Sequence, residues 1–165
     1  MSALRDTAIV GIGQTEFSKR SGRSELQLAA EASLAAIADA GLAPADIDGM
    51  VTFTQDGNDA LDLMRCLGVE ELHWTARTPF GGGGSAATVQ LACAAVASGA
   101  ATHVLVYRAF NERSGQRFGQ PDSGGIGARL GVDFHFSFGL DTPAKIYSVW
   151  YKRYMDRYGV TNEDL

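Results

Sequence analysis

Four consecutive glycines, Gly81 to Gly84, are the feature of this 165-residue chain that most constrains its fold. They follow an apolar segment, and an alanine-rich segment begins directly after them at Ser85. Because glycine has no Cβ, it tolerates positive φ and lets a ligand approach the backbone closely. We therefore predict a sharp strand-to-helix turn with φ above zero, whose free N–H groups can bind an oxyanion or a thioester carbonyl. A turn that is merely flexible or tightly packed is the alternative.

Apolar runs rich in β-branched residues alternate along the chain with patterns of helical spacing. Strands are expected at 7–13, 49–54, 72–76 and 103–107, and helices at 25–40, 60–67, 85–97 and 144–158. Ser24 and Gln27 have the spacing of a capping box at the start of the first helix, in which the Gln27 side chain reaches back to the cap. This order predicts an α/β layered fold, with the helix at 85–97 buried at its centre because it lacks a charged face.

Charge and cysteine content exclude several classes of function. The net charge of −5 gives no electrostatic support for a nucleic-acid or anionic-membrane partner. Cys66 and Cys93 form no CxxC pair, so neither a disulfide framework nor a metal site is predicted. No signal peptide and no apolar run long enough to span a membrane is present, and a cytoplasmic location is expected.

Neither glycine-containing segment matches a nucleotide-binding motif. Gly11-Ile12-Gly13 begins like a dinucleotide fingerprint, but Glu16 stands where a third glycine is needed for helix and strand to pack. The glycines 81–84 are not followed by the Gly-Lys-Ser/Thr of a phosphate-binding loop.

Arginines in a long polar segment at 111–131 are candidates for binding phosphate groups. Arg108, Arg113 and Arg117, together with Asn111 and Ser114, could hold the phosphates of coenzyme A. An ordinary solvated loop explains the same composition equally well.

Other reactive side chains favour structural roles. Cys93 lies among apolar neighbours in a helix and Cys66 lies in another apolar helix, so both are expected in the core. His135 stands between two phenylalanines, which favours packing over acid-base chemistry. Tyr147 and Tyr151 belong to an aromatic stripe of helical spacing that could line a ligand tunnel, although helix packing requires the same spacing.

Four segments together carry a family resemblance. They are 8–15, the helix at 24–41 with the following 46–50, the glycine turn with its helix ending at Ala97-Ser98-Gly99, and 154–161. In this order and spacing they resemble the thiolase superfamily, in its branch of sterol-carrier and lipid-transfer proteins. The resemblance implies an αβαβα layered fold of which this chain is the amino-terminal half, with a mixed sheet and a buried central helix. It also implies an amino-terminal α/β domain at 1–110 and the truncated start of a loop or cap region at 111–165.

The glycine turn departs from the thiolase pattern where the chemistry occurs. A thiolase begins its central helix with a nucleophilic cysteine, and aligning the helix ends places that position at Gly82, with Ser85 at a usual glycine position. Glycine supplies no thiolate for an acyl-enzyme. Members of this branch without the cysteine include retro-aldolases. The resemblance therefore implies an aldolase that cleaves a β-hydroxyacyl-CoA thioester of a steroid side chain to a ketone and a short acyl-CoA such as propionyl-CoA.

The resemblance also implies which parts of the site this chain holds. Coenzyme A enters as part of the substrate, with no covalently bound cofactor, and the acid and base are expected beyond Leu165. The candidate substrate-binding residues are Gly82, Gly83, Gly84, Ser85, Arg113 and Arg117. A homodimer and a small OB-fold partner protein are implied as well. Two alternatives stay open: a non-catalytic subunit that binds lipid acyl-CoA, and an acyltransferase that uses Cys93 or Cys66.

Overall fold

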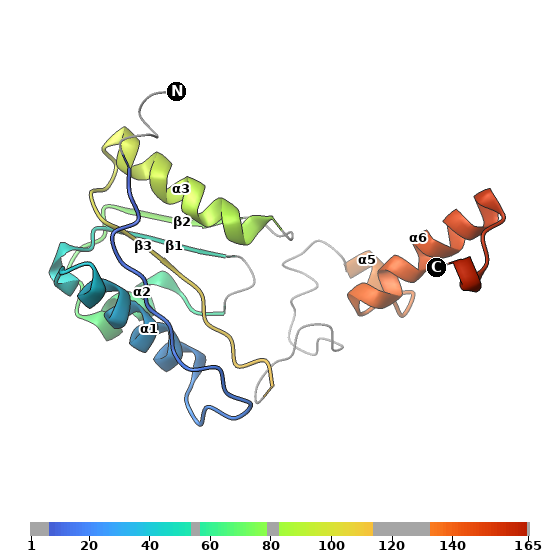
Figure 1. Ribbon diagram of the computed structural model, residues 1–165, viewed down its shortest axis with the longest axis horizontal. Coiled ribbons are helices and arrows are strands. Elements are labelled where there is room, and N and C mark those ends of the chain that lie inside the picture. Colours follow the sequence, from blue (N-terminus) through green and yellow to red (C-terminus); the bar gives the residue numbers. More distant parts are fainter. Residues whose placement is uncertain (1–6, 54–56, 79–82, 114–132, 165) are drawn as a thin grey trace. The chain divides into compact units, whose positions relative to one another are not determined.

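The computed structural model describes residues 7–53, 57–78, 83–113 and 133–164 (Figure 1). The chain divides into two compact units, Met1–Gly115 (unit 1) and Gln116–Leu165 (unit 2). Each unit is described by itself below.

Unit 1 is built on a parallel sheet of three strands, β1 (Gly49–Phe53), β2 (Trp74–Thr78) and β3 (Val104–Tyr107), in the order β2-β1-β3. α2 (Ala60–Leu67) connects β1 to β2, and α3 (Gly84–Ser98) connects β2 to β3. Figure 1 shows α3 on one face of the sheet and α2 with α1 (Glu25–Asp39) on the other. The α/β fold class predicted from the alternation is confirmed.

The core of unit 1 lies between β1 and the helices α1 and α2. All five residues of β1 are buried, as expected for the central strand of a sheet covered on both faces. Met50 points into the cluster that also contains Leu63 of α2 and Ile37 of α1, and Met50 and Leu63 are fully inaccessible. A one-turn helix, η2 (Pro44–Asp46), leads into β1.

The helices of unit 1 begin and end close to where the sequence places them. Ser24 caps α1, with its side chain accepting a hydrogen bond from the backbone N–H of Gln27 at 3.1 Å. The reciprocal half of the predicted capping box is absent, because the Gln27 amide donates instead to Glu31, one turn further along, at 2.9 Å. Gly68 and Gly99 end α2 and α3 in the left-handed conformation that favours glycine.

The strand predicted at 7–13 is wrong. This segment has no regular structure and its apolar side chains are exposed, Ile9 at 74% and Ile12 at 76%. It lies instead along α1, where the Ile12 N–H donates to Asp39 at 2.9 Å and a Cβ on Gly11 would fall 2.3 Å from the Ala36 carbonyl oxygen. An apolar β-branched run marks a segment suited to burial, but only a neighbouring strand supplies ladder hydrogen bonds.

α3 is covered on one face only within the described residues. Thr88, Ala92 and Ala95 are buried toward the sheet, whereas Val89 is 39% exposed. The expectation of a helix buried on all sides is therefore not met in the described part of the chain. The residues of α3 are small on every face. The sequence therefore does not distinguish the face that is buried against the sheet from the face that is exposed.

The described part of unit 2 contains α5 (Asp133–Phe136), α6 (Pro143–Tyr158) and a one-turn helix, η3 (Asn162–Asp164). α6 is capped by Thr142, whose hydroxyl accepts from the Lys145 N–H, and it ends at Gly159 with φ 68°. No residue of α6 is buried. Within the ranges that the structure describes, no helix is long and apolar enough to cross a membrane.

Candidate functional site

The three strands of unit 1 end together at one edge of the sheet, at Phe53, Thr78 and Tyr107, because they are parallel. α1, α2 and α3 all begin at this carboxyl edge (Figure 1). The chain leaves β1 toward one face and β2 toward the other. Ligands of open parallel α/β sheets bind at such an edge, where neighbouring connections diverge. The carboxyl edge is therefore the candidate site.

The glycine turn lies at this edge, directly before α3. Gly83 occupies the N-cap position with φ −78°, and no side chain caps the helix. The prediction of positive φ is wrong at Gly83 and Gly84, since neither belongs to the positive-φ glycines of the described chain. A Cβ on Gly83 would meet no atom within 4 Å, so packing does not require glycine there either. The first N–H groups of α3 therefore carry no side-chain cap.

Burial differs sharply between neighbouring residues of this turn. Gly84 is buried and Ser85 is exposed. The Ser85 carbonyl accepts a hydrogen bond from the Thr88 hydroxyl, which ties the first turn of α3 together. Gly81 and Gly82, including the position that matches the thiolase nucleophile, lie outside the described residues.

A buried carbonyl holds the chain between β1 and α2 against the other two strands. The Asn58 carbonyl accepts from the Tyr107 hydroxyl at 3.2 Å and from the Arg77 guanidinium at 3.1 Å. The Thr52 hydroxyl donates to the Tyr107 carbonyl at 3.0 Å. These bonds join the ends of β1, β2 and β3, so the floor of the site is a rigid frame.

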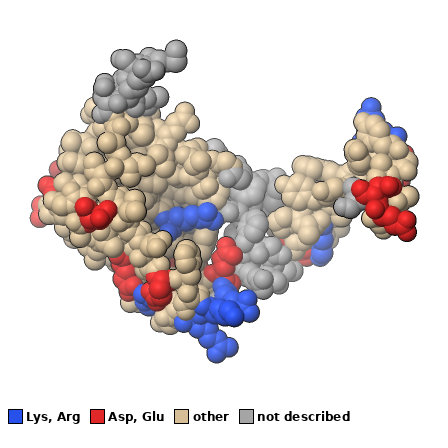
Figure 2. All heavy atoms as spheres, in the orientation of Figure 1, with Lys and Arg blue, Asp and Glu red and all other residues tan. Residues whose placement is uncertain are grey.

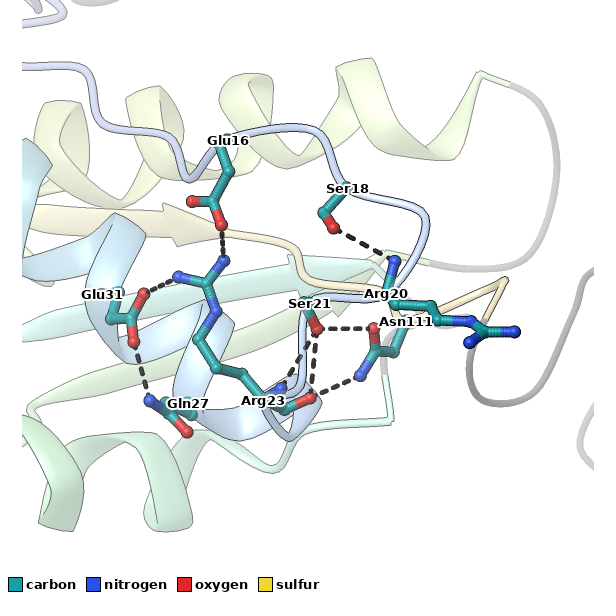
Figure 3. A network of polar contacts seen from close by, with 8 residues as sticks. All are labelled: Glu16, Ser18, Arg20, Ser21, Arg23, Gln27, Glu31 and Asn111. Atoms are coloured by element: carbon teal, nitrogen blue, oxygen red, sulfur yellow. Dashed lines mark hydrogen bonds and ion pairs between the residues drawn. The ribbon is translucent and has the colours of Figure 1, made fainter.

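A polar network connects the loop before α1 with the chain after β3 (Figure 3). The Asn111 side chain accepts from the Ser21 hydroxyl at 3.0 Å and donates to the Arg23 carbonyl. The Asn111 N–H donates to Glu25 at 2.9 Å. The Arg23 guanidinium is paired with two carboxylates, those of Glu16 and Glu31. Burial lowers the pKa of Arg23, but these two carboxylates outweigh it and raise the pKa above its ordinary value.

The arginines expected to bind phosphate have different surroundings. The Arg108 guanidinium lies over two aromatic rings, 5.2 Å from the centroid of Phe53 and 4.4 Å from that of Phe110. Arg113 is exposed, two residues after Asn111. Asn111 itself is occupied by the network and is not free to bind a ligand. Ser114 and Arg117 lie outside the described residues.

The amino edge of the sheet is built differently. The Asp48 carboxylate accepts from the backbone N–H of Thr102 at 2.8 and 2.9 Å and from that of His103 at 2.8 Å. Burial alone would raise the pKa of Asp48, but the hydrogen bonds from His103 and Thr102 hold it below its ordinary value. His73 lies 3.7 Å from the same carboxylate. Both histidines of unit 1 are therefore at the edge opposite the candidate site.

Neither cysteine lies in a site suited to nucleophilic catalysis. Cys93 is half-buried in the middle of α3, whereas Cys66 on α2 is exposed, so the core position expected for Cys66 is wrong. Its neighbour Arg65 pairs with Asp62 at 3.4 Å. Among the described residues, no group of three or more His, Cys, Asp or Glu side chains could hold a metal ion.

The remaining candidates belong to unit 2. Tyr147, Tyr151 and Met155 line an open groove along α6, and Asn162 also contributes to its lining. Both tyrosines are more than half exposed, at 52% and 56%. His135 packs edge-on against Phe134, with ring centroids 6.2 Å apart, in agreement with its expected structural role.

Comparison with known proteins gives relatives of one kind. The chain is 53% identical over 163 residues to a steroid side-chain-cleaving aldolase of Thermomonospora curvata, a match that covers 95% of this chain and 41% of the relative. It is 52% identical over 166 residues to a 17-hydroxy-3-oxo-4-pregnene-20-carboxyl-CoA lyase of Mycobacterium tuberculosis, covering 95% of this chain and 42% of that protein. The chain thus spans about two fifths of the length of these curated relatives. No family model matches it.

Two solved structures are similar to this chain. An Ltp2-ChsH2(DUF35) aldolase superimposes with a TM-score of 0.73 at 53% identity, over 95% of this chain and 40% of that one. An SCP2-thiolase-like protein of Mycobacterium smegmatis superimposes with a TM-score of 0.50 at 26% identity, over 59% of this chain and 22% of that one. The fold is thiolase-like.

The structure places four of the predicted site residues on the carboxyl side of the sheet of unit 1. Gly83 precedes α3, Gly84 and Ser85 are its first residues, and Arg113 lies in the chain that follows β3. Sequence reasoning missed the loop before α1, whose Ser21 is bonded to Asn111 across 90 positions of the chain. Local patterns carry no signal for such a contact, because the two segments meet only in the folded sheet.

Proposed function

We propose that this chain forms part of an aldolase that cleaves a β-hydroxyacyl-CoA thioester of a steroid side chain. The products are a ketone and a short acyl-CoA such as propionyl-CoA. The observation that carries the proposal is the 53% identity to a steroid side-chain-cleaving aldolase, which extends over 95% of the chain. The absence of cysteine from residues 81–85, at the start of α3, supports chemistry without an acyl-enzyme.

The proposed reaction is a retro-aldol cleavage. A base removes the proton of the β-hydroxyl group, the oxygen electrons form the ketone C=O, and the bond between the α and β carbons breaks. Its electron pair passes to the thioester, which becomes an enolate, and an acid then protonates the α carbon. Each atom is thereby accounted for without an oxidant or a covalent intermediate. The acid and base are proposed to lie outside residues 1–165.

The part proposed for this chain is to bind the substrate. The uncapped N–H groups at the start of α3, at Gly83, Gly84 and Ser85, would donate to the thioester oxygen as negative charge develops on it. Gly82 would leave space for the thioester where a thiolase has its cysteine. Arg113 and Arg117 would contact the phosphates of coenzyme A.

The proposal extends to partners and location. A homodimer and a small OB-fold partner are proposed for the whole protein, and the solved Ltp2-ChsH2(DUF35) aldolase is a two-component assembly by its name. The protein is proposed to act in the cytoplasm, as the substrate is a coenzyme A thioester.

The test is a product assay on the protein in its natural full length, alone and with its partner. We expect 17-hydroxy-3-oxo-4-pregnene-20-carboxyl-CoA, the substrate in the name of one relative, to give a 17-ketosteroid and propionyl-CoA by mass spectrometry. The matched control is the same thioester without the 17-hydroxyl, which cannot undergo this cleavage. Binding of both thioesters without turnover would contradict the proposal and favour a carrier subunit.

A further inference from the structure

Two segments that are far apart in sequence place exposed cations on the carboxyl side of unit 1. The loop before α1 contributes Lys19 and Arg20, and the chain after β3 contributes Arg108 and Arg113. All four side chains belong to exposed residues, and none has an ion pair in the part of the chain that the structure describes. Because the chain has a net charge of −5, exposed cations in one region indicate a binding site for an anionic ligand.

The two segments are held together by the network around Asn111. Its side chain binds Ser21 and the Arg23 carbonyl, and its N–H binds Glu25. Arg20 directly precedes Ser21, and Arg113 follows Asn111 by two residues. Figure 3 shows the Arg20 side chain extending away from the ion pairs of Arg23. In Figure 2, a group of Lys and Arg atoms lies at the lower end of unit 1, with Asp and Glu atoms close to it.

Arg23 provides an internal contrast, because it belongs to the same loop but is neutralised. Glu16 and Glu31 occupy its guanidinium from two sides. Its role is to fix the loop, whereas Lys19 and Arg20 keep their charge available. The exposed carboxylate of Glu112, next to Arg113 in the chain, reduces the positive charge, and no ion pair joins it to a cation within the described residues.

The Arg108 guanidinium lies over two aromatic rings. The rings of Phe53 and Phe110 lie against its guanidinium, so rotation of the side chain is restricted before any ligand arrives. The N–H groups at the edge of a stacked guanidinium stay able to bind phosphate oxygens. A fixed donor loses less entropy on binding than a free one.

We propose that Lys19, Arg20, Arg108 and Arg113 form one binding site for the phosphate groups of the coenzyme A part of the substrate. The inference rests on the proposed function and adds to it the loop before α1. The 3′-phosphate and the pyrophosphate of coenzyme A present several negative charges, which suits cations contributed by two loops. The acyl-pantetheine arm would then extend from these loops along the carboxyl edge of the sheet.

The first test separates the phosphates from the rest of the substrate. We compare the steroid acyl-CoA with the same acyl group on pantetheine, which lacks the nucleotide and its phosphates, using the full-length protein with its partner. Arg20→Gln and Arg113→Gln should each raise KM for the acyl-CoA about tenfold, since each removes a charge-assisted hydrogen bond, and should leave kcat unchanged. KM for the pantetheine thioester should not change. Equal losses with both thioesters would overturn the site.

A matched control variant is available on α2. Arg65 is also an exposed arginine of unit 1, but it pairs with Asp62 and does not belong to either loop. Arg65→Gln should therefore leave KM for the acyl-CoA unchanged. A rise in KM equal to that of Arg20→Gln would mean that net charge, and not this site, determines the affinity.

The second test does not depend on catalysis. Titration calorimetry with coenzyme A, dephospho-coenzyme A and pantetheine should give the tightest binding for coenzyme A, weaker binding without the 3′-phosphate, and the weakest for pantetheine. If the affinities follow this order but the substrate is not cleaved, the aldolase proposal is rejected and the phosphate site is kept. Cleavage with unaltered KM in both Arg20→Gln and Arg113→Gln would reject the phosphate site and keep the aldolase. Loss of partner binding in those variants, with KM unchanged, would assign the cations to an acidic protein surface and overturn the proposal.

Discussion

The two edges of the sheet in unit 1 use polar groups in opposite ways. At the amino edge the Asp48 carboxylate is saturated by backbone N–H groups of Thr102 and His103. At the carboxyl edge α3 starts without a side-chain cap, and cations such as Arg113 have no ion-pair partner among the described residues. Groups that satisfy one another stabilise a fold, whereas groups left open can bind a ligand. The open groups at the carboxyl edge support the proposal that a ligand binds there.

Gly11 and Gly83 differ in how closely other atoms surround them. A Cβ on Gly11, which lies against the last turns of α1, would fall 2.3 Å from the Ala36 carbonyl oxygen and 2.8 Å from the Ala40 Cβ. A Cβ on Gly83 would meet nothing within 4 Å. Packing therefore explains the first glycine and leaves the second unexplained by structure within the described residues.

The largest expected effect is that of Gly11→Ala. The added methyl group would collide with the helix backbone, which cannot move aside as a flexible side chain can. We expect the free energy of unfolding to fall by about 1 to 3 kcal/mol. Urea denaturation followed by circular dichroism measures this change. An unchanged midpoint would show that residues 7–13 are not packed on α1 in solution.

Asp48→Asn tests the amino edge itself. The amide keeps one acceptor oxygen but places an NH₂ group against a backbone donor, so hydrogen bonds to a charged acceptor are lost. We expect a loss of about 2 kcal/mol in the free energy of unfolding. KM for the acyl-CoA should stay the same, because Asp48 lies at the opposite edge from the proposed site. A rise in KM without loss of stability would instead indicate that the amino edge binds the substrate.

Asp48 should also make the free energy of unfolding depend on pH. The pKa of Asp48 is lower in the folded protein than its ordinary value, so the folded state binds its proton less readily than the unfolded state does. Its contribution to stability is complete above about pH 4 and is lost as the pH falls through the folded pKa. In acid denaturation, Asp48→Asn should flatten this part of the curve. An identical acid limb in both proteins would contradict the role of Asp48.

The smallest effect on stability is expected for Gly83→Ala, the counterpart of Gly11→Ala. Its φ of −78° suits alanine, which gains from a less flexible unfolded chain but is a poorer N-cap than glycine. The two contributions are similar in size, so the free energy of unfolding should change by less than about 0.5 kcal/mol. If the thioester lies against this backbone, kcat/KM should nevertheless fall more than tenfold. Unchanged activity and stability together would leave the glycine without a role in either.

Much of the local structure follows from the sequence. α2 was predicted at 60–67, where the structure has Ala60–Leu67, and α6 was predicted at 144–158, where the structure has Pro143–Tyr158. Such helices are predictable because capping residues and apolar spacing act within a few residues of each other. The segment 7–13 was not predictable in this way, since its state depends on whether a strand lies beside it.

Sequence by itself determined the α/β class of this protein, the approximate positions of α1, α2, α3 and α6, and the absence of cysteine from residues 81–85. The tertiary structure decided which polar groups are satisfied. Only folding brings Ser21 to Asn111 and thereby places Arg20 and Arg113 in neighbouring loops, while Arg23, three residues after Arg20, is neutralised by Glu16 and Glu31. The physical reason is range: helix caps and strand patterns depend on neighbours along the chain, whereas charge pairing and burial depend on neighbours in space.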